Sequence, residues 1–415
     1  MSQDRILDLN PKCHIVFLHN KFRKKSGDRY VIDLALGLKE YGHKVTIMTS
    51  ALDTSNCFPE VYPTHGVLDV KYSASYLPSN WYCLKALLMA LRVCLFPPKP
   101  RPEVVILDTH TVALFIFSKF SRYRTILLTH FSAIKELDFF TNYLKVTPDL
   151  FTATTIPYAS EILVETDCLG EIFKRSFPNV EKELRYITPC VDTGLWKDDC
   201  IDIHRIIPDL PANANLFAVF GPYKKRSNFR LALEAMENLM FTSEESLRDK
   251  FHLIIGGNCN ETNTDELVYY DELIDIAKEK QFGSQVTFVR QLPIVYQKTV
   301  LKKCAALLIT AKHDPFPNVI VSALMMGKPI IATNSGFCKK ALTHRINGIL
   351  LDSDPQKFAA AMHKIVTNPM VQMFISEMAS DLFRKEYSFD CVARKINGLV
   401  QKQITNACLK KPSPI

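Results

Sequence analysis

The sequence has no paired cysteine motif and no apolar run long enough to cross a bilayer, and both absences narrow the protein classes it can belong to. Its 12 cysteines are scattered and none form a C-x-x-C pair, which argues against a structural zinc site. This cysteine usage suits a reducing compartment. The opening residues, M-S-Q-D-R-I-L-D-L-N, do not read as a signal peptide, because a strand is predicted directly after them at residues 13–18.

A dinucleotide-binding glycine fingerprint is also missing. The strand at 13–18 leads through a basic loop into a helix predicted at 30–41 and a second strand, which is a βαβ opening without the G-x-G-x-x-G spacing. The cations in or beside this loop are Lys21, Arg23, Lys24, Lys25 and Arg29. They fit either a phosphate or membrane contact or a solvated loop, and the residues alone leave both open.

Length and composition indicate a folded protein with two domains. A chain of 415 residues exceeds one ordinary core, and its 47% hydrophobic residues are enough for large ones. We predict domains at 1–200 and 201–385, followed by a terminal helix and tail at 386–415. The 51 basic and 43 acidic residues give a mild formal charge of +8, which suits a phosphorylated substrate, an anionic membrane, nucleic acid or simply a basic soluble enzyme.

The most informative stretch runs from residue 305 to residue 351. Two apolar strands, A-A-L-L-I-T and K-P-I-I-A-T-N, flank a loop and a helix that begins near Asn318, which predicts a parallel sheet covered on both faces. Such sheets bind ligands at the carboxyl ends of their strands, and the free N–H groups of a helix start favour an anion. We therefore predict a phosphate-bearing ligand at this edge of an α/β fold.

Two other strand ends carry candidate residues. After a strand predicted at 216–221, Lys224, Lys225 and Arg226 stand just ahead of a helix, where their charge and the helix dipole add; a solvated basic turn is the alternative. His130 follows a strand at 125–129, at the edge where chemistry is expected, although a lone histidine is more often structural.

The most lipophilic segment is W-Y-C-L-K-A-L-L-M-A-L-R-V-C-L-F, at residues 81–96. At about 16 residues it is short for a transmembrane helix, which needs roughly 20. Lys85 and Arg92 are its only charges and are two helical turns apart, so they should share one face. The segment is either an amphipathic helix in a membrane interface or a helix packed against protein.

The ordered motifs together resemble a known family. They are F-L-H, T-H-F, the basic turn before N-F-R-L-A-L-E-A-M, H-D-P-F-P-N-V-I-V-S-A-L-M-M-G-K-P-I-I-A-T-N-S-G, and N-G-I-L. Their order is similar to that of the retaining glycosyltransferases of family 4, and most similar to eukaryotic α-1,3/1,6-mannosyltransferases that extend the dolichol-linked oligosaccharide. The resemblance implies an α/β fold of the GT-B kind, with two Rossmann-like domains facing across a cleft.

The resemblance also implies which residues form the site. The family's histidine falls on His130, and the glutamate linked to the transferred sugar falls on Asp314. The glutamate linked to the ribose falls on Ser322, and the arginine and lysine that hold the donor diphosphate fall on Pro222 and Ser227. We accordingly expect His130 and Asp314 as catalytic residues. The expected substrate-binding residues are Lys224, Lys225, Arg226, Phe316, Asn318, Val319 and Ser322.

By the same resemblance, the chain would move mannose from GDP-mannose to a lipid-linked (dolichol-diphosphate) oligosaccharide, with retention at the anomeric carbon and without a metal or other cofactor. Its place would be the cytosolic face of the endoplasmic reticulum membrane. The expected partners are the nucleotide sugar, the lipid acceptor, the membrane surface and other glycosylation enzymes, and no nucleic acid.

Two alternatives stay open. Pro222, Ser227 and Ser322 replace charged residues, so the chain could be a catalytically inactive paralogue that serves as a scaffold or regulatory subunit of a glycosylation complex. A soluble glycosyltransferase that makes another glycan would fit if segment 81–96 were buried against protein.

Overall fold

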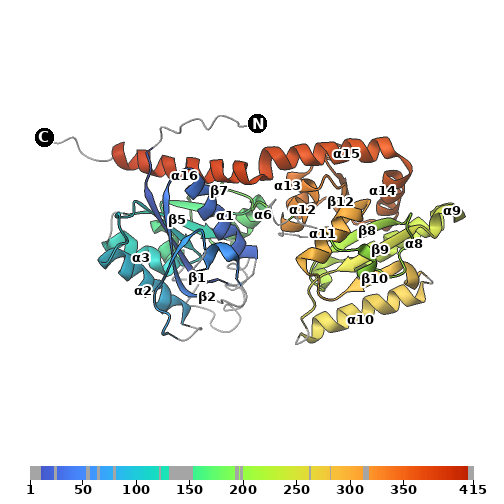
Figure 1. Ribbon diagram of the computed structural model, residues 1–415, viewed down its shortest axis with the longest axis horizontal. Helices are drawn as coiled ribbons and strands as arrows, with labels where there is room; N and C mark the ends of the chain where they lie inside the picture. The colour runs from blue at the N-terminus through green and yellow to red at the C-terminus, as the bar shows by residue number, and fades with distance from the viewer. Residues whose placement is uncertain are drawn as a thin grey trace. The chain divides into compact units, whose positions relative to one another are not determined.

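The computed structural model describes residues 11–22, 26–52, 57–62, 66–77, 81–120, 123–129, 153–191, 196, 200–260, 263–280, 282–311 and 317–409. The chain divides into two compact units, one made of Met1–Cys190 with Phe389–Ile415 and the other of Val191–Ser388. Each unit contains a parallel sheet with helices on both faces (Figure 1), which confirms the predicted α/β class.

The described part of the first unit contains a seven-stranded sheet in the order β3-β2-β1-β4-β5-β6-β7, in which every pair of neighbours is parallel. Its strands are β1 (His14–Phe22), β2 (Lys44–Leu52), β3 (Asp69–Tyr72), β4 (Val104–Asp108), β5 (Arg124–Thr129), β6 (Glu161–Val164) and β7 (Leu184–Tyr186). β1 and β4 are neighbours, so their carboxyl ends lie side by side. Strand β3 was not predicted, because its short sequence D-V-K-Y is mostly exposed and carries no apolar run.

Helices cover both faces of this sheet because successive residues of a strand point to opposite sides. The helices are α1 (Ser26–Glu40), α2 (Tyr82–Leu95), α3 (Thr111–Phe120), α6 (Asp167–Ser176) and α16 (Phe389–Leu409). Ile15 and Ile106 pack with α1 and α16, whereas Val16 and Val105 pack with α2, α3 and α6. The last helix of the chain thus completes the core of the first unit.

His43 joins α16 to this sheet and shows why the helix docks there. Its Nδ1 accepts a hydrogen bond from the backbone N–H of Cys13 at 3.2 Å, so the proton resides on Nε2. Nε2–H donates to Oδ1 of Asn397 at 2.9 Å. A buried polar pair of this kind fixes the register of α16 against the sheet, in addition to the apolar contacts.

The second unit contains a six-stranded sheet in its described residues, in the order β10-β9-β8-β11-β12-β13, again with parallel neighbours throughout. Its strands are β8 (Asn215–Phe220), β9 (Phe251–Gly256), β10 (Val286–Val289), β11 (Ala306–Ile309), β12 (Ile330–Thr333) and β13 (Ile349–Leu351). The strand–helix–strand prediction for residues 305–351 is confirmed by β11, β12 and the helix between them. The short edge strand β13 was not predicted.

The helices of the second unit are α8 (Phe229–Thr242), α9 (Glu245–Arg248), α10 (Thr264–Glu279), α11 (Ile294–Lys303), α12 (Pro317–Met325), α13 (Gly336–Ala341), α14 (Pro355–Thr367) and α15 (Pro369–Leu382). Helices α8, α10 and α14 pack on the sheet face that carries Phe217 and Leu253. Helices α11, α12 and α13 pack on the other face, against Ile254 and Leu307.

The composition of residues 198–215 suggests a linker between domains, but the structure places residues 201–214 in the second unit. A single 3-10 turn at Ile203–Arg205 is followed by Ile206 and Ile207, and all three isoleucines of this stretch lie in the core of the unit. Isoleucines at positions i, i+3 and i+4 bury one face of the turn. The Pro and Asp residues around them hide this pattern when only composition is considered.

Candidate functional site

The basic turn after β8 is fastened to its neighbours by a set of short polar contacts. Ser227 is buried and its hydroxyl donates to the carbonyl of Pro222 at 2.6 Å. The hydroxyl of Thr310, which follows β11, donates to the carbonyl of Ser227 at 2.7 Å. Asn228 precedes α8 in the left-handed region, at φ 50° and ψ 44°, and its Nδ2 donates to the Thr310 carbonyl at 3.4 Å. The turn therefore has a defined position at the carboxyl edge of the sheet.

At the same edge of the sheet, Gly257, just after β9, packs closely against the backbone of Gly221. A Cβ atom on Gly257 would lie only 1.6 Å from the carbonyl oxygen of Gly221, so any side chain at this position would displace the turn. Tyr223 lies under the turn, where its hydroxyl donates to the carbonyl of Ile255 at 2.8 Å. Burial raises the pKa of Tyr223 well above its usual value, so the phenol stays a hydrogen-bond donor.

The three predicted cations have different surroundings. The Nζ of Lys224 lies 2.9 Å from Oε1 of Glu266, whose side chain is only 7% exposed. Glu266 also accepts from the backbone N–H of Asn260 at 2.8 Å and from Nδ2 of Asn263 at 3.2 Å. Lys225 is exposed and Arg226 is half-buried. Lys224 is therefore held by a buried carboxylate, while Lys225 faces solvent.

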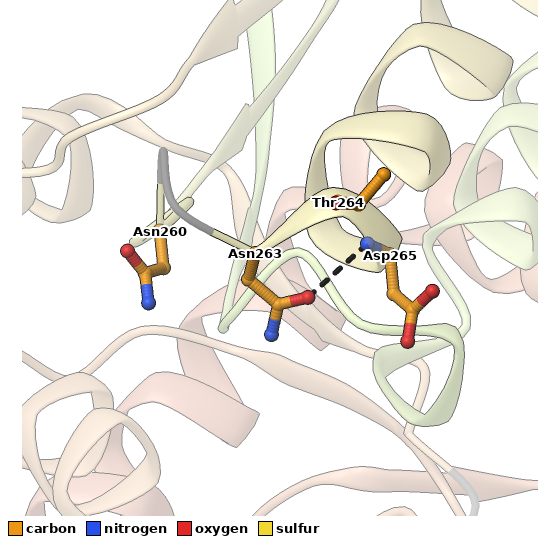
Figure 2. Close-up of a pocket in the computed structure, with 4 residues that line it drawn as sticks. All are labelled: Asn260, Asn263, Thr264 and Asp265. Atoms are coloured by element: carbon orange, nitrogen blue, oxygen red, sulfur yellow. Dashed lines mark hydrogen bonds between the residues drawn. The ribbon is translucent and has the colours of Figure 1, made fainter.

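Beside this ion pair, the start of α10 borders an open hollow of about 480 Å³ (Figure 2). It is lined by Asn260, Asn263, Thr264 and Asp265. The Asn263 side chain caps the helix by accepting from the backbone N–H of Asp265 at 3.1 Å. Contacts from Asn260 and Asn263 to Glu266 thus connect this rim to the basic turn.

The predicted ribose partner is occupied within its own helix. Ser322 is 3% exposed, and its hydroxyl donates to the carbonyl of Asn318 one turn earlier, at 2.8 Å. Asn318 and Val319 are half-buried in the first turn of α12. The start of α12 therefore lies after β11 as predicted, but the hydroxyl of Ser322 is already used. His130, Asp314 and Phe316 lie outside the residues that the structure describes.

Several residues that build this edge were missed at the level of sequence. Asn228 carried a signal, since an asparagine directly before a helix is a frequent cap residue. Thr310, at the end of a buried strand, carried a weaker one. Glu266 carried none, because its contact with Lys224 joins two loops that the sequence alone does not bring together.

The first unit has its own polar cluster at the carboxyl ends of β1 and β4. Nδ1 of the buried His19 lies 2.5 Å from Oδ2 of Asp108, and its Nε2 lies 3.1 Å from the Lys21 carbonyl and 3.4 Å from Oδ1 of Asp28. Burial lowers the pKa of His19, but hydrogen bonds to Asp108 and Asp28 outweigh it and raise the pKa to about 10. His19 is therefore an imidazolium at neutral pH.

A second histidine of this cluster is uncharged at neutral pH. His110 follows β4 by two residues and is buried, and burial lowers its pKa to about 4. Two nearby histidines thus differ in protonation at neutral pH because, among the described residues, only His19 is hydrogen-bonded to carboxylates. Apart from the position of F-L-H at the end of the first strand, no pattern in the sequence predicts this pairing.

Segment 81–96 forms helix α2, and its two charges differ from the prediction. Lys85 is buried at 4% exposure, whereas Arg92 is exposed and donates to the carbonyl of Tyr72 at 2.9 Å. Seven positions apart in one helix, the two residues share a face as predicted, but only Arg92 is exposed, so they do not form an exposed basic surface. In the described part of the chain, no helix combines the length and apolar character needed to span a bilayer.

Comparison with known proteins agrees with this architecture. Residues 201–382 match the family described as glycosyl transferases group 1. The chain is 26% identical to the alpha-1,3/1,6-mannosyltransferase ALG2 of Homo sapiens, over 97% of this chain and 99% of that protein. It is 25% identical to the ALG2 protein of Dictyostelium discoideum, over 94% and 98%.

A solved structure extends the likeness to three dimensions. Sucrose-phosphate synthase from Thermosynechococcus elongatus superposes with a TM-score of 0.70 at 15% identity, covering 95% of this chain and all of that one. Likeness at this identity concerns the fold, and it includes both parallel-sheet units. Residues 201–382 are therefore a group 1 glycosyl transferase domain, in a chain with the two-unit GT-B fold of that class of enzymes.

Proposed function

We propose that the protein is a retaining mannosyltransferase that moves mannose from GDP-mannose to a lipid-linked oligosaccharide in the assembly of the N-glycan precursor, at the cytosolic face of the endoplasmic reticulum. The observation that carries the proposal is the likeness to alpha-1,3/1,6-mannosyltransferases over almost the full length of both chains. The acceptor in this proposal is a dolichol-diphosphate oligosaccharide. The transfer reaction needs no metal or cofactor.

The carboxyl edge of the second sheet supports donor binding there. A nucleoside diphosphate sugar carries its negative charge on the diphosphate, and Lys225 and Arg226 stand at the start of α8 near the end of β8. Two helix starts, of α8 and α12, follow strands at the same edge, and their N–H groups favour anions. The contacts of Thr310 and Asn228 hold the turn before a ligand arrives, which lowers the entropy cost of binding.

The proposed chemistry breaks the bond between the anomeric carbon and the phosphate oxygen and forms a bond from that carbon to an acceptor hydroxyl oxygen. The hydroxyl proton passes to the departing diphosphate. Lys225, Arg226 and the helix starts stabilise the charge that develops on the leaving group. Asp314 and His130 orient the sugar in this proposal.

A second candidate function is a catalytically inactive subunit of a glycosylation complex. Three contacts favour it: the Ser322 hydroxyl bonds within its helix, the Ser227 hydroxyl bonds to Pro222, and Lys224 pairs with Glu266. Ser322 and Ser227 stand at positions where the resembling family contacts the ligand. Lys224 is one of the cations that could replace a lost family cation.

Helix α2 is the proposed contact with the membrane. Its ends expose Trp81 (50%), Leu84 (38%) and Leu95 (68%), followed by Phe96 (77%), while its inner face packs on the sheet. A helix with this pattern rests its exposed apolar residues in the interfacial region of a bilayer.

Calorimetric titration of the full chain with GDP-mannose at low salt tests donor binding, which the mannosyltransferase requires. Saturable binding, competed by GDP and not by UDP, supports the mannosyltransferase. Absence of binding of either nucleotide contradicts it and leaves the inactive subunit.

A further inference from the structure

Lys85 is a buried cation without an assigned role. It is 4% exposed in the first turns of α2, and no hydrogen bond or ion pair joins its side chain to the residues that the structure describes. Burial, followed by the charge of Lys21, lowers the pKa of Lys85. Holding an ammonium group away from water and without a partner costs free energy, so such a side chain is suited to bind an anion.

Two further positive groups lie at the same place. The N-cap residue of α2 is Trp81, whose side chain makes no capping hydrogen bond, and the first turn contains no acidic residue. Within the part of the chain that the structure describes, no side chain caps the N–H groups of this turn, and such groups favour an anion. Side chains of a helix lean toward its N-terminus, so the Lys85 ammonium leans toward these N–H groups.

Lys21 adds its charge from the sheet. It lies near the carboxyl end of β1, in register with Ala51 of β2, and α2 packs against both strands. Its side chain also forms no ion pair among the described residues. Lys21 and Lys85 thus stand on elements that pack together at this end of the sheet, where a doubly charged ligand would relieve the repulsion between their ammonium groups.

We propose that Lys85, Lys21 and the first turn of α2 form a phosphate-binding site in the first unit. Its ligand is a phosphate or diphosphate group, which comes either from a lipid head group or from a soluble phosphate. Exposed Trp81 and Leu84 at the same end of α2 favour the lipid, because an attached hydrocarbon chain would cover them. Naming the diphosphate of the lipid-linked acceptor as that group rests on the proposed function, whereas phosphate binding itself does not.

The test measures the affinity of the full-length protein for inorganic pyrophosphate and for farnesyl diphosphate below its micelle concentration. All titrations contain excess GDP, so that the state of the second unit stays constant. We expect both ligands to bind, and Lys85→Met to weaken both by about tenfold or more, the effect of one charge-assisted hydrogen bond. Lys85→Arg should retain most of the affinity. Lys119→Met, which removes an exposed charge from the neighbouring α3, is the matched control and should bind as the wild type does.

The two ligands distinguish the source of the phosphate. Tighter binding of farnesyl diphosphate identifies a lipid site, and equal binding identifies a site for soluble phosphate; both support the proposal. Failure of both ligands to bind, or equal affinity in wild type and Lys85→Met, overturns it. Lys85→Met should fold with unchanged or higher thermal stability, since it removes a buried charge that has no ion pair among the described residues. GDP-mannose binding by the same variant reports on the proposed function separately.

Discussion

The Nζ of Lys224 lies 2.9 Å from the buried carboxylate of Glu266, so this lysine is already paired at the place where the donor diphosphate would bind. The pair links the basic turn to the start of α10, because Glu266 also accepts hydrogen bonds from Asn260 and Asn263. Lys224 is therefore less available to a ligand than the exposed Lys225.

Neutralising these cations should affect nucleotide binding unequally. We expect Lys225→Met and Arg226→Met each to weaken GDP-mannose binding by roughly tenfold or more, because a charged hydrogen bond contributes about 1.5–3 kcal/mol. Lys224→Met should have a smaller effect. Calorimetry measures the three affinities, with Lys278→Met at the exposed end of α10 as the control. A larger loss in Lys224→Met than in the other two variants would contradict this prediction, because it would show that the diphosphate contacts mainly Lys224.

Ser322→Glu tests whether the donor site binds GDP-mannose weakly because it lacks the carboxylate expected at this position. The hydroxyl of Ser322 bonds to the Asn318 carbonyl, and a longer carboxylate could instead reach a ribose hydroxyl beyond the first turn of α12. We expect tighter GDP-mannose binding, by roughly tenfold for one charged hydrogen bond. Ser322→Gln has the same length without the charge and should give a smaller gain. Weaker binding in both variants, with the fold intact by circular dichroism, would mean that this side chain does not face the ligand.

Stability should depend on pH through His19. Its pKa in the folded protein is about 10, above the ordinary 6.5, so its stabilising contribution is complete below pH 6.5 and declines as pH rises toward 10. Asp108→Asn removes the partner that holds Nδ1 and should flatten this decline. Thermal unfolding followed across that range by circular dichroism provides the measurement. An equal decline in wild type and variant would show that the pH dependence does not arise from the His19–Asp108 pair.

Binding to membranes should depend on the exposed residues of α2. We expect Leu84→Glu with Phe96→Glu to lower the fraction of protein that floats with phospholipid vesicles, since both apolar side chains would leave the interface. Phe241→Glu changes an equally exposed phenylalanine of α8 and serves as the control. Flotation that is lower in the control and unchanged in the α2 variant would place the membrane contact elsewhere.

The fold class could be predicted from the sequence because most strands and helices are encoded by local patterns. Buried strands such as Val104–Asp108 and Ile330–Thr333 are apolar runs bounded by polar residues, and each can be identified without its neighbours. The strand Asp69–Tyr72 was missed because it is mostly exposed and has no apolar run. The strand Ile349–Leu351 is apolar, but at three residues it is too short to be identified from its pattern.

The candidate site depends on contacts between distant residues, which no local pattern encodes. Thr310 bonds to Ser227 across 83 positions, and His19 pairs with Asp108 across 89. The basic turn was visible as a motif, yet the pairing of Lys224 with Glu266 was not. Likewise, helical spacing placed Lys85 and Arg92 on one face, but the sheet buries only the first.

Transfer of mannose tests the central claim most directly. The full-length protein is incubated with GDP-mannose and a mannosylated lipid-diphosphate oligosaccharide acceptor, and the lipid product is examined by mass spectrometry. We predict a product heavier by one or two hexoses, α-linked at the new bonds, and little product with the Lys225→Met/Arg226→Met double variant. An unchanged acceptor, under conditions in which GDP-mannose is bound, would contradict transferase activity and identify the chain as a nucleotide-sugar-binding subunit.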